Sequence, residues 1–192
     1  MKRLYIIAGC NGAGKTTASF TVLPEMLNCK EFVNADEIAR GLSPFQPEKV
    51  AFEAGRIMLN RMDELLRSEE SFAFETTLAS KTFIKFIKEA KFHNFEITLI
   101  FFWLKSHEIA EERVKTRVLE GGHNIPSDVI IRRYKRGLSN FFNIYINKVD
   151  NWMFVDNSET ATRIISECFA KEIIVYDQKL WKQLIKENEQ NR

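Results

Sequence analysis

A glycine-rich run near the amino terminus has residue types and spacing suited to holding phosphate groups. It matches G-x-x-x-x-G-K-[ST] between Gly9 and Thr16, with an apolar run before it and a helical pattern after it. Its glycines let backbone N–H groups turn toward phosphate oxygens, and the following helix presents the positive end of its dipole. We interpret the run as a Walker A loop; an ordinary glycine-rich turn is the alternative. The residues expected to bind ATP are Gly9, Asn11, Gly12, Ala13, Gly14, Lys15, Thr16 and Thr17.

Two residues of this loop have distinct expected tasks in phosphoryl transfer. Lys15 is expected to reach the β- and γ-phosphates and is assigned a catalytic role. The hydroxyl of Thr16 is expected to ligate Mg²⁺, which accompanies ATP in such sites. A Walker A loop alone serves ATPases, switches and kinases, so the class of protein depends on what other residues reach the same edge of the sheet.

Polar side chains follow two further apolar runs and could act on the transferred group. Asp36 comes just past one run, where its carboxylate could accept the proton of an attacking hydroxyl, and Asn34 lies beside it. Capping of the helix that follows is an alternative role for this segment, and the two roles are compatible. Glu75 and Thr77 end another run, where they could bind an acceptor or hold the water shell of Mg²⁺. A polar turn is the alternative there.

The segment 113–136 carries a local surplus of positive charge. It holds seven basic and two acidic residues, a local charge of +5 in a chain whose net charge is +2. Arg113 and Arg117 fall on one helical face, and so do Arg132 and Arg136. We expect guanidinium groups of this segment to meet the transferring phosphoryl group, and we assign Arg113 and Arg117 a catalytic role. A solvated charged face is the alternative for any one of these arginines.

A glycine pair at 121–122 joins two predicted helices of this basic segment by a bend. Ser106 is suited to cap the first helix, and Pro126 lies near the start of the second. We therefore expect residues 106–138 to form a helical lid that excludes water, which competes with the acceptor for the phosphoryl group. His123 offers no metal-ligand spacing with the other histidines. The expected lid residues are Arg117, His123, Arg132 and Arg136.

Short apolar runs alternate with amphipathic segments along the chain, which is typical of an α/β domain with a mostly parallel sheet. The predicted strands cover 4–8, 32–34, 72–75, 97–104 and 152–155. Helices are predicted over 50–66 and 81–91, on both sides of the glycine pair, and from Leu180 onward. We expect one domain over 1–192, with 159–192 forming a C-terminal hairpin and helix.

Composition limits the functions that this chain can have. Lys and Arg number 28 against 26 Asp and Glu, so no nucleic-acid partner is expected from overall charge. No apolar run approaches the length of a membrane span, and no membrane association is expected. Three widely spaced cysteines suit a reducing compartment better than a disulfide framework. The first apolar run turns into glycines instead of a cleavage site, so a cytoplasmic location is expected.

Residues 147–150 spell N-K-x-D, the motif with which guanine-binding switch proteins read the base. Such a motif should follow a strand, but the best candidate for the fifth strand, 152–155, comes after it. No D-x-x-G lies between the Walker A loop and this point to act as a γ-phosphate switch. We therefore favour a turn at a helix end over a GTPase.

Taken in order, these motifs resemble those of the zeta-toxin-like P-loop kinase family over about residues 4–158. The resemblance rests on the Walker A loop and on the segments 34–37, 74–77, 121–126 and 155–158. It implies a three-layer P-loop NTPase sandwich whose five-stranded, mainly parallel sheet has the order 2-3-1-4-5, with a helical lid. It also implies that Asp36 is the general base, that lid arginines stabilise the transition state, and that Asn157 lies beside the adenine. The implied acceptor-binding residues are Asn34, Asp36, Glu75 and Thr77.

The well-known toxins of this family resemble 3′-kinases of UDP-N-acetylglucosamine, so this nucleotide sugar is the implied acceptor, and an antitoxin-like protein inhibitor is an implied partner. The chain departs from those toxins in its short length and in having His123 where a lid arginine is expected. Two functions stay open. One is an ATP-dependent phosphotransferase that acts on a small-molecule hydroxyl. The other is a P-loop ATPase that switches a protein partner, which would need no acceptor pocket beyond the γ-phosphate.

Overall fold

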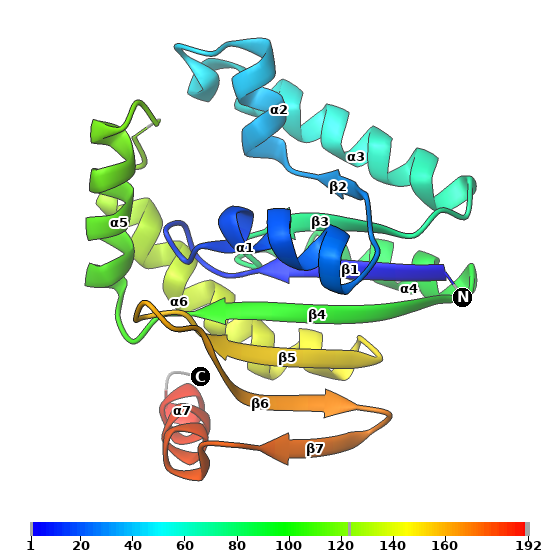
Figure 1. Cartoon of the computed structure of the whole chain (residues 1–192), viewed down its shortest axis with the longest axis vertical. Coiled ribbons are helices and arrows are strands. Elements are labelled where there is room, and N and C mark those ends of the chain that lie inside the picture. The colour runs from blue at the N-terminus through cyan, green and yellow to red at the C-terminus, as the bar shows by residue number, and fades with distance from the viewer. Residues whose placement is uncertain (1, 123, 191–192) are drawn as a thin grey trace.

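The computed structural model describes residues 2–122 and 124–190, and within them a single sheet organises the fold (Figure 1). The strand order is β2-β3-β1-β4-β5-β6-β7. The strands are β1 (Lys2–Ala8), β2 (Glu31–Val33), β3 (Phe72–Thr76), β4 (Phe95–Trp103), β5 (Asn151–Asp156), β6 (Arg163–Phe169) and β7 (Glu172–Val175). The first five are parallel and follow the expected order, so the α/β class is confirmed.

The predicted C-terminal hairpin joins this sheet, which corrects the expectation of five strands. β6 pairs antiparallel with β5, with Trp152 opposite Cys168, and β7 pairs antiparallel with β6. Backbone N–H and C=O groups at the edge of β5 would otherwise lack partners, so the hairpin extends the sheet to seven strands in the described part of the chain.

Helices connect the parallel strands, as crossovers in such sheets require. They are α1 (Lys15–Thr21), α2 (Ala35–Leu42), α3 (Ala51–Arg67), α4 (Phe83–Phe92), α5 (His107–Leu119), α6 (Ser127–Asn143) and α7 (Gln178–Gln190), with short helices at Val22–Met26, Pro47–Val50 and Tyr145–Asn147. The predicted helices over 50–66 and 81–91 correspond to α3 and α4. No helix in the described residues is long and apolar enough to cross a membrane.

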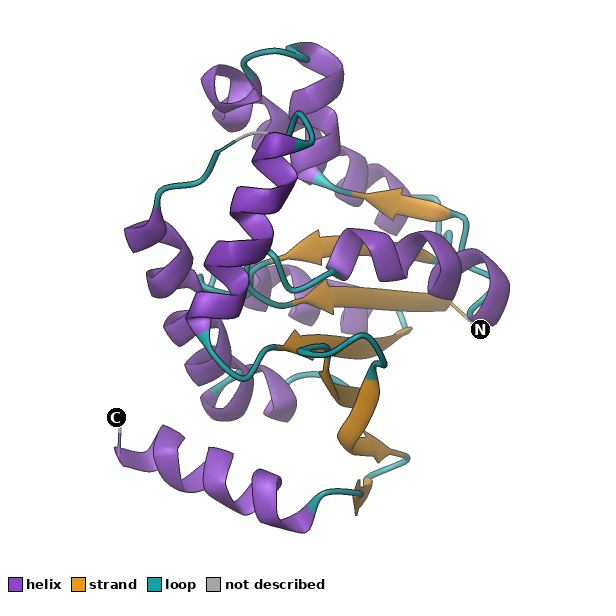
Figure 2. Cartoon of the chain, turned by 60° about the vertical axis from the view of Figure 1, so that its left-hand side comes forward, coloured by secondary structure: helices purple, strands orange, loops and turns teal. Residues whose placement is uncertain are grey.

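Alternate residues of the central strands bury against opposite faces of the sheet, which gives two apolar cores. Helices lie against both faces of the sheet (Figure 2). On one face Leu4 and Ile6 of β1 pack in the core to which α3, α4, α6 and α7 contribute. On the other face Tyr5 and Ile7 pack with Val114 of α5. All of these strand residues are nearly inaccessible to solvent, and the three layers hold the strand ends in fixed relative positions.

The carboxyl ends of the parallel strands meet at one edge, where the arrowheads of β1 and β4 point toward α5 (Figure 1). Ala8, the last residue of β1, is in register with Thr76 of β3 and Phe101 of β4. Trp103, which ends β4, is in register with Asp156 of β5. The Walker A loop and the polar segments after β2, β3 and β5 therefore come together at this edge, where ligands bind in open α/β sheets.

Candidate active site

The Walker A loop leaves β1 and enters α1 with backbone angles that depend on its glycines. Gly9, Gly12 and Gly14 have φ values of 142°, 78° and 83°, in the region that residues with a β-carbon rarely adopt. A β-carbon on Gly12 would also come 2.6 Å from the carbonyl oxygen of Ala110 in α5. Within the loop, burial raises the pKa of the Cys10 thiol to about 11, so this thiol stays protonated and unreactive at neutral pH.

The two functional side chains of the loop converge on Glu75 at the end of β3. Lys15 Nζ donates to the Cys10 carbonyl at 2.9 Å and lies 3.3 Å from Glu75 Oε1. Thr16 Oγ1 donates to Glu75 Oε2 at 2.7 Å, and Asn34 Nδ2 donates to the same oxygen at 2.9 Å. The Glu75 side chain is only 9% exposed, so these partners compensate a charge that burial would otherwise destabilise. Four of the predicted site residues therefore form one cluster.

Asp36 lies beside this cluster because Asn34 caps α2. The side-chain oxygen of Asn34 accepts a hydrogen bond from the backbone N–H of Asp36 at 2.8 Å, as an N-cap does. The capping role and the site role of this segment therefore coexist. Asp36 itself is exposed to solvent in the first turn of α2, where the helix dipole stabilises its negative charge. An exposed carboxylate at this position is suited to accept a proton from a hydroxyl.

The residues present fit Mg²⁺ bound together with a nucleotide. The hydroxyl of Thr16 and the carboxylate of Glu75 are hard oxygen donors, which Mg²⁺ prefers. Among residues 2–122 and 124–190 there is no group of three or more His, Cys, Asp or Glu side chains that could hold a metal by themselves. This agrees with the usual mode of Mg²⁺, which takes one or two protein ligands and completes its shell with phosphate oxygens and water.

Arg113 and Arg117 both come from α5, but they have different surroundings. Arg113 is half-buried and donates to the Ser158 carbonyl at 3.1 Å, with a long contact of 3.5 Å to the Gly12 carbonyl. Arg117 Nε and Nη2 are buried and make no hydrogen bond within the described residues. A buried guanidinium group with free donors is poised to bind an anion. Arg113 is therefore engaged with two loops, whereas Nε and Nη2 of Arg117 have no hydrogen-bond partner among the described residues.

Arg133 of α6 reaches the Walker A loop, although it was not among the arginines singled out from the sequence. Its Nη1 donates to Asn11 Oδ1 at 2.9 Å. Burial lowers the pKa of Arg133, while the negative charge of Asp36 acts in the opposite direction, so Arg133 lies within the field of that carboxylate. The sequence did contain a signal that Arg133 faces inward. It lies one helical turn from Ile130 and one turn from Gly137, and both of these residues are buried on the inner face of α6.

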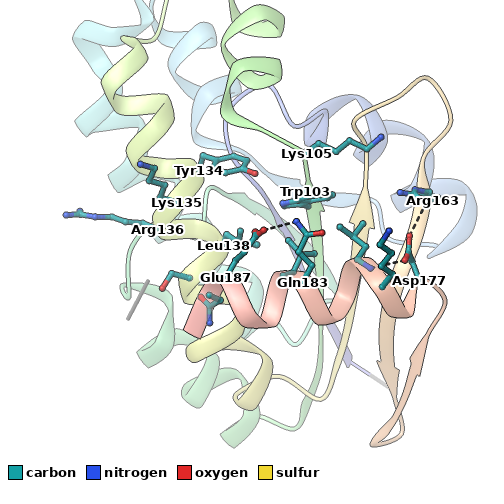
Figure 3. Close-up of a pocket in the computed structure, with 15 residues that line it drawn as sticks. Trp103, Lys105, Tyr134, Lys135, Arg136, Leu138, Arg163, Asp177, Gln183 and Glu187 are labelled. Carbon is teal, nitrogen blue, oxygen red and sulfur yellow. Dashed lines mark hydrogen bonds and ion pairs between the residues drawn. The ribbon is translucent and has the colours of Figure 1, made fainter. Parts of the chain in front are cut away.

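Arg132 and Arg136, the predicted lid residues of α6, are exposed to solvent. Arg136 borders a cavity of about 840 Å³ between α6 and α7, with Trp103 and Tyr134 also in its lining (Figure 3). Neither side chain contacts the Walker A loop in this structure. His123, a further predicted lid residue, lies outside the described residues. The assignment of residues 106–138 as a lid stays a prediction.

The remaining predicted residues have clear positions. Thr17 is exposed on α1. Thr77 is half-buried just after β3, and its carbonyl packs so closely on α6 that a β-carbon on Gly137 would come 2.6 Å from it. Asn157 follows β5 and bonds to the Walker A loop itself, where its side chain donates to the Ala13 carbonyl at 2.8 Å. The edge thus gathers side chains that are up to 144 positions apart in the sequence.

The N-K-x-D segment has a structural use instead of a nucleotide-binding one. Asp150 accepts a hydrogen bond from the backbone N–H of Ile97 at 2.9 Å and pairs with Lys91 at 2.8 Å. These contacts lie near the start of β4, at the edge of the sheet opposite to the Walker A loop. A base-reading role at that distance from the loop is physically unsuitable, in agreement with the interpretation as a turn.

The fold and this cluster define a P-loop kinase architecture, and comparison with known proteins identifies the family. A sequence model described as "Zeta toxin" matches residues 1–180. The chain therefore belongs to the zeta toxin family, which confirms the resemblance seen in the motifs. A protein of Haemophilus influenzae, described only as uncharacterized, is 31% identical over 127 residues, which is 66% of this chain and 88% of that protein.

Several solved structures share the fold. A chain of the AvrRxo1-ORF1:-ORF2 complex crystallised with ATP is 18% identical, with a TM-score of 0.76 over 96% of this chain and 63% of that chain. A chain from the PezAT toxin-antitoxin system of Streptococcus pneumoniae is 13% identical, with a TM-score of 0.65 over 98% of this chain and 85% of that chain. A gluconokinase from Sinorhizobium meliloti has a TM-score of 0.53 at 13% identity, covering 82% of this chain and 83% of that chain. This chain therefore spans less than two thirds of the AvrRxo1 chain that it matches.

Proposed function

We propose that this protein is an ATP-dependent phosphotransferase that moves the γ-phosphoryl group of ATP to a hydroxyl of a small molecule. The observation that carries the proposal is the position of Asp36. Asn34 caps its helix and bonds to the Glu75 carboxylate that also holds Thr16. A proton acceptor is thus linked, through Asn34, to the carboxylate that holds Thr16, the expected Mg²⁺ ligand. A site that only hydrolyses ATP needs a residue to orient water, but it has no need of an acceptor pocket.

Each residue of the cluster has a role in this reaction. Lys15 and the backbone N–H groups of the loop hold the β- and γ-phosphates. Mg²⁺ bound to Thr16 would neutralise charge on the phosphates, with Glu75 in its surroundings. Asp36 accepts the proton of the acceptor hydroxyl as that oxygen forms its bond to phosphorus and ADP leaves. Arg117 and Arg133 present guanidinium groups to the phosphoryl oxygens during transfer.

The family and the neighbouring structures support ATP as donor and a protein as partner. One AvrRxo1 structure was solved with ATP, and the PezAT neighbour belongs to a toxin-antitoxin system. By this likeness we include an antitoxin-like inhibitor protein among the proposed partners.

For the acceptor we propose a nucleotide sugar, with UDP-N-acetylglucosamine as the first candidate, bound across Asn34, Asp36, Glu75 and Thr77. The candidate rests on the family. A nucleotide sugar also carries a diphosphate, which needs a cationic partner. Arg61 is a nearby cation, but it already pairs with Glu31 at 2.8 Å and with Glu64 at 3.3 Å. Arg61 lines a pocket of about 810 Å³ beside Asn34, and it is not free to bind a diphosphate there without losing these partners.

ATP consumption measured with and without UDP-N-acetylglucosamine, followed by mass analysis for an added phosphate, tests this proposal. We expect acceptor-dependent formation of ADP together with a phosphorylated sugar nucleotide. If another small molecule is phosphorylated efficiently and this one is not, the acceptor is wrong and the kinase stands. If hydrolysis is indifferent to every acceptor and a protein partner stimulates it, the protein is a nucleotide-dependent switch.

Replacing Arg133 by alanine is expected to lower kcat about 10²-fold, because it removes a half-buried cation from the phosphoryl site. Arg132→Ala is the matched control, since it removes the same charge from the next, exposed position of α6. Steady-state kinetics of both variants make the comparison. Equal losses in the two variants would mean that general charge, and not the placement of Arg133, matters for turnover.

A further inference from the structure

Three side chains bind carbonyl groups of the Walker A loop, two from outside the loop and one from within it. Asn157 Nδ2 donates to the Ala13 carbonyl at 2.8 Å. Lys15 Nζ donates to the Cys10 carbonyl at 2.9 Å, and Arg113 makes the longer contact to the Gly12 carbonyl. Of these three contacts, the bond from Asn157 is the short one that comes from outside the loop, from the end of β5. Asn157 lies 144 positions from its acceptor.

Holding a carbonyl fixes the direction of the next N–H group. The C=O and N–H of one peptide unit point in opposite directions because the unit is planar and trans. The bond from Asn157 to Ala13 O therefore turns the N–H of Gly14 to the other side of that peptide. Gly14 has a φ of 83°, and glycine adopts several backbone conformations at little cost, so this peptide needs an external constraint. N–H groups directed inward are what bind phosphate in such a loop.

Asn157 is itself held firmly enough to provide that constraint. Its Oδ1 accepts a hydrogen bond from Thr162 Oγ1 at 2.8 Å, and its Nδ2 faces Ala13 because a carbonyl oxygen can only accept. Its backbone N–H donates to the Trp103 carbonyl at 2.9 Å. The preceding residue, Asp156, is 3% exposed and bonds to Arg163 and Ser158. A β-carbon on Gly14 would collide with Asn157 Nδ2, so the loop and this side chain are closely packed.

We propose that Asn157 is a positioning residue that orders the phosphate-binding backbone through the Ala13–Gly14 peptide. The resemblance to the zeta-toxin-like kinases implied a place for Asn157 beside the adenine. The contact with Ala13 gives it a further task that does not depend on the base. The inference rests on the proposed function only to the extent that the loop binds the phosphates of ATP, and it does not depend on the acceptor or on phosphoryl transfer.

Binding of inorganic tripolyphosphate tests the proposal, because this probe carries the phosphates without base or sugar. Asn157→Asp keeps the shape of the side chain but places a carboxylate oxygen against the Ala13 carbonyl, which repels it. We expect calorimetry to show the affinity for tripolyphosphate falling about 10-fold or more, and the affinity for ATP falling by a similar factor. Glu159→Gln is the control, since Glu159 lies in the same loop and contacts only the exposed Lys105 among the described residues.

Two outcomes would overturn the proposal. Tripolyphosphate affinity that stays unchanged while ATP affinity falls would mean that Asn157 contacts the nucleoside. Affinities that stay unchanged for both probes would mean that the loop orders itself. If the aspartate variant does not fold, Thr162→Val takes its place. This substitution leaves the bond to Ala13 possible but lets the Asn157 amide rotate. We expect the affinity for each probe to fall about 2- to 5-fold. No change in either affinity would again overturn the proposal.

Failure of this inference can be distinguished from failure of the proposed function. If wild-type protein phosphorylates an acceptor but Asn157→Asp binds tripolyphosphate normally, the kinase stands and the positioning role falls. If the wild-type protein binds tripolyphosphate and the Asn157→Asp variant binds it weakly, yet no acceptor is ever phosphorylated, the positioning role stands and the kinase proposal falls.

Discussion

Replacing Lys15 by methionine is expected to abolish phosphoryl transfer, with a loss of about 10³-fold or more in kcat/KM. The substitution keeps an apolar stem of similar length and removes the ammonium group that lies 3.3 Å from Glu75 Oε1. ATP binding should weaken, while the backbone cradle of the loop stays in place. Coupled measurement of ADP formation, with calorimetry of ATP binding, gives both quantities.

The Lys15→Met variant must be shown to be folded before its activity is interpreted. Lys15 is 5% exposed and partners a carboxylate that is 9% exposed, so some loss of stability is expected and a thermal melt must show that the variant is folded. Turnover of ATP by a folded Lys15→Met variant at the wild-type rate would show that the loop is not the phosphate-binding element.

The change Asp36→Asn is expected to lower turnover about 10²- to 10⁴-fold while the affinity for ATP stays the same. Asparagine nearly preserves the shape of the side chain but does not accept the proton of the acceptor hydroxyl. The cap on α2 involves the backbone N–H of Asp36, which the variant retains. Steady-state kinetics with a good acceptor and calorimetry with ATP separate the two effects.

Glu37→Gln is the matched control for Asp36. Both residues lie in the first turn of α2, so each substitution removes one negative charge from the same helix end and has a similar effect on stability. Glu37 pairs with Arg40 on the surface of the helix. Unaltered turnover in Asp36→Asn would remove this residue from the mechanism, and a matching fall in ATP affinity would point to a role in binding Mg²⁺.

The parallel strands could be anticipated because most of them are compact apolar runs, whereas their order was implied only by the resemblance to the zeta-toxin-like kinases. The strand β4 alternates apolar and polar residues from Phe95 to Leu99 but then continues as an unbroken buried apolar run to Trp103, as expected of a strand covered on both faces. The helix α2 could be anticipated only through its start, where Asn34 is suited to cap it, because a helix of eight residues is too short to show a long periodic pattern. The hairpin was predicted from its local pattern, but its pairing with β5 is a long-range contact that local pattern does not encode.

The positions of the candidate site residues could be anticipated where chemistry and spacing lie within one segment, as in the Walker A loop and the pair Asn34 and Asp36. They could not be anticipated where the rotation of a helix decides which side chain faces inward. Helical spacing singled out Arg132 and Arg136, but close packing of Gly137 on the carbonyl of Thr77 turns α6 so that Arg133 reaches the loop. The contact between Asn157 and Ala13 depends in the same way on tertiary packing.

Transfer of labelled γ-phosphate from ATP into a small-molecule fraction tests the central claim most directly. Purified protein is incubated with labelled ATP, Mg²⁺ and candidate acceptors that include UDP-N-acetylglucosamine, and Asp36→Asn is run beside it. We predict that the wild type places the label on an acceptor hydroxyl and that Asp36→Asn binds ATP but leaves the acceptor unlabelled. Label that appears only as free phosphate, at the same rate in both proteins and with every acceptor, would contradict the account.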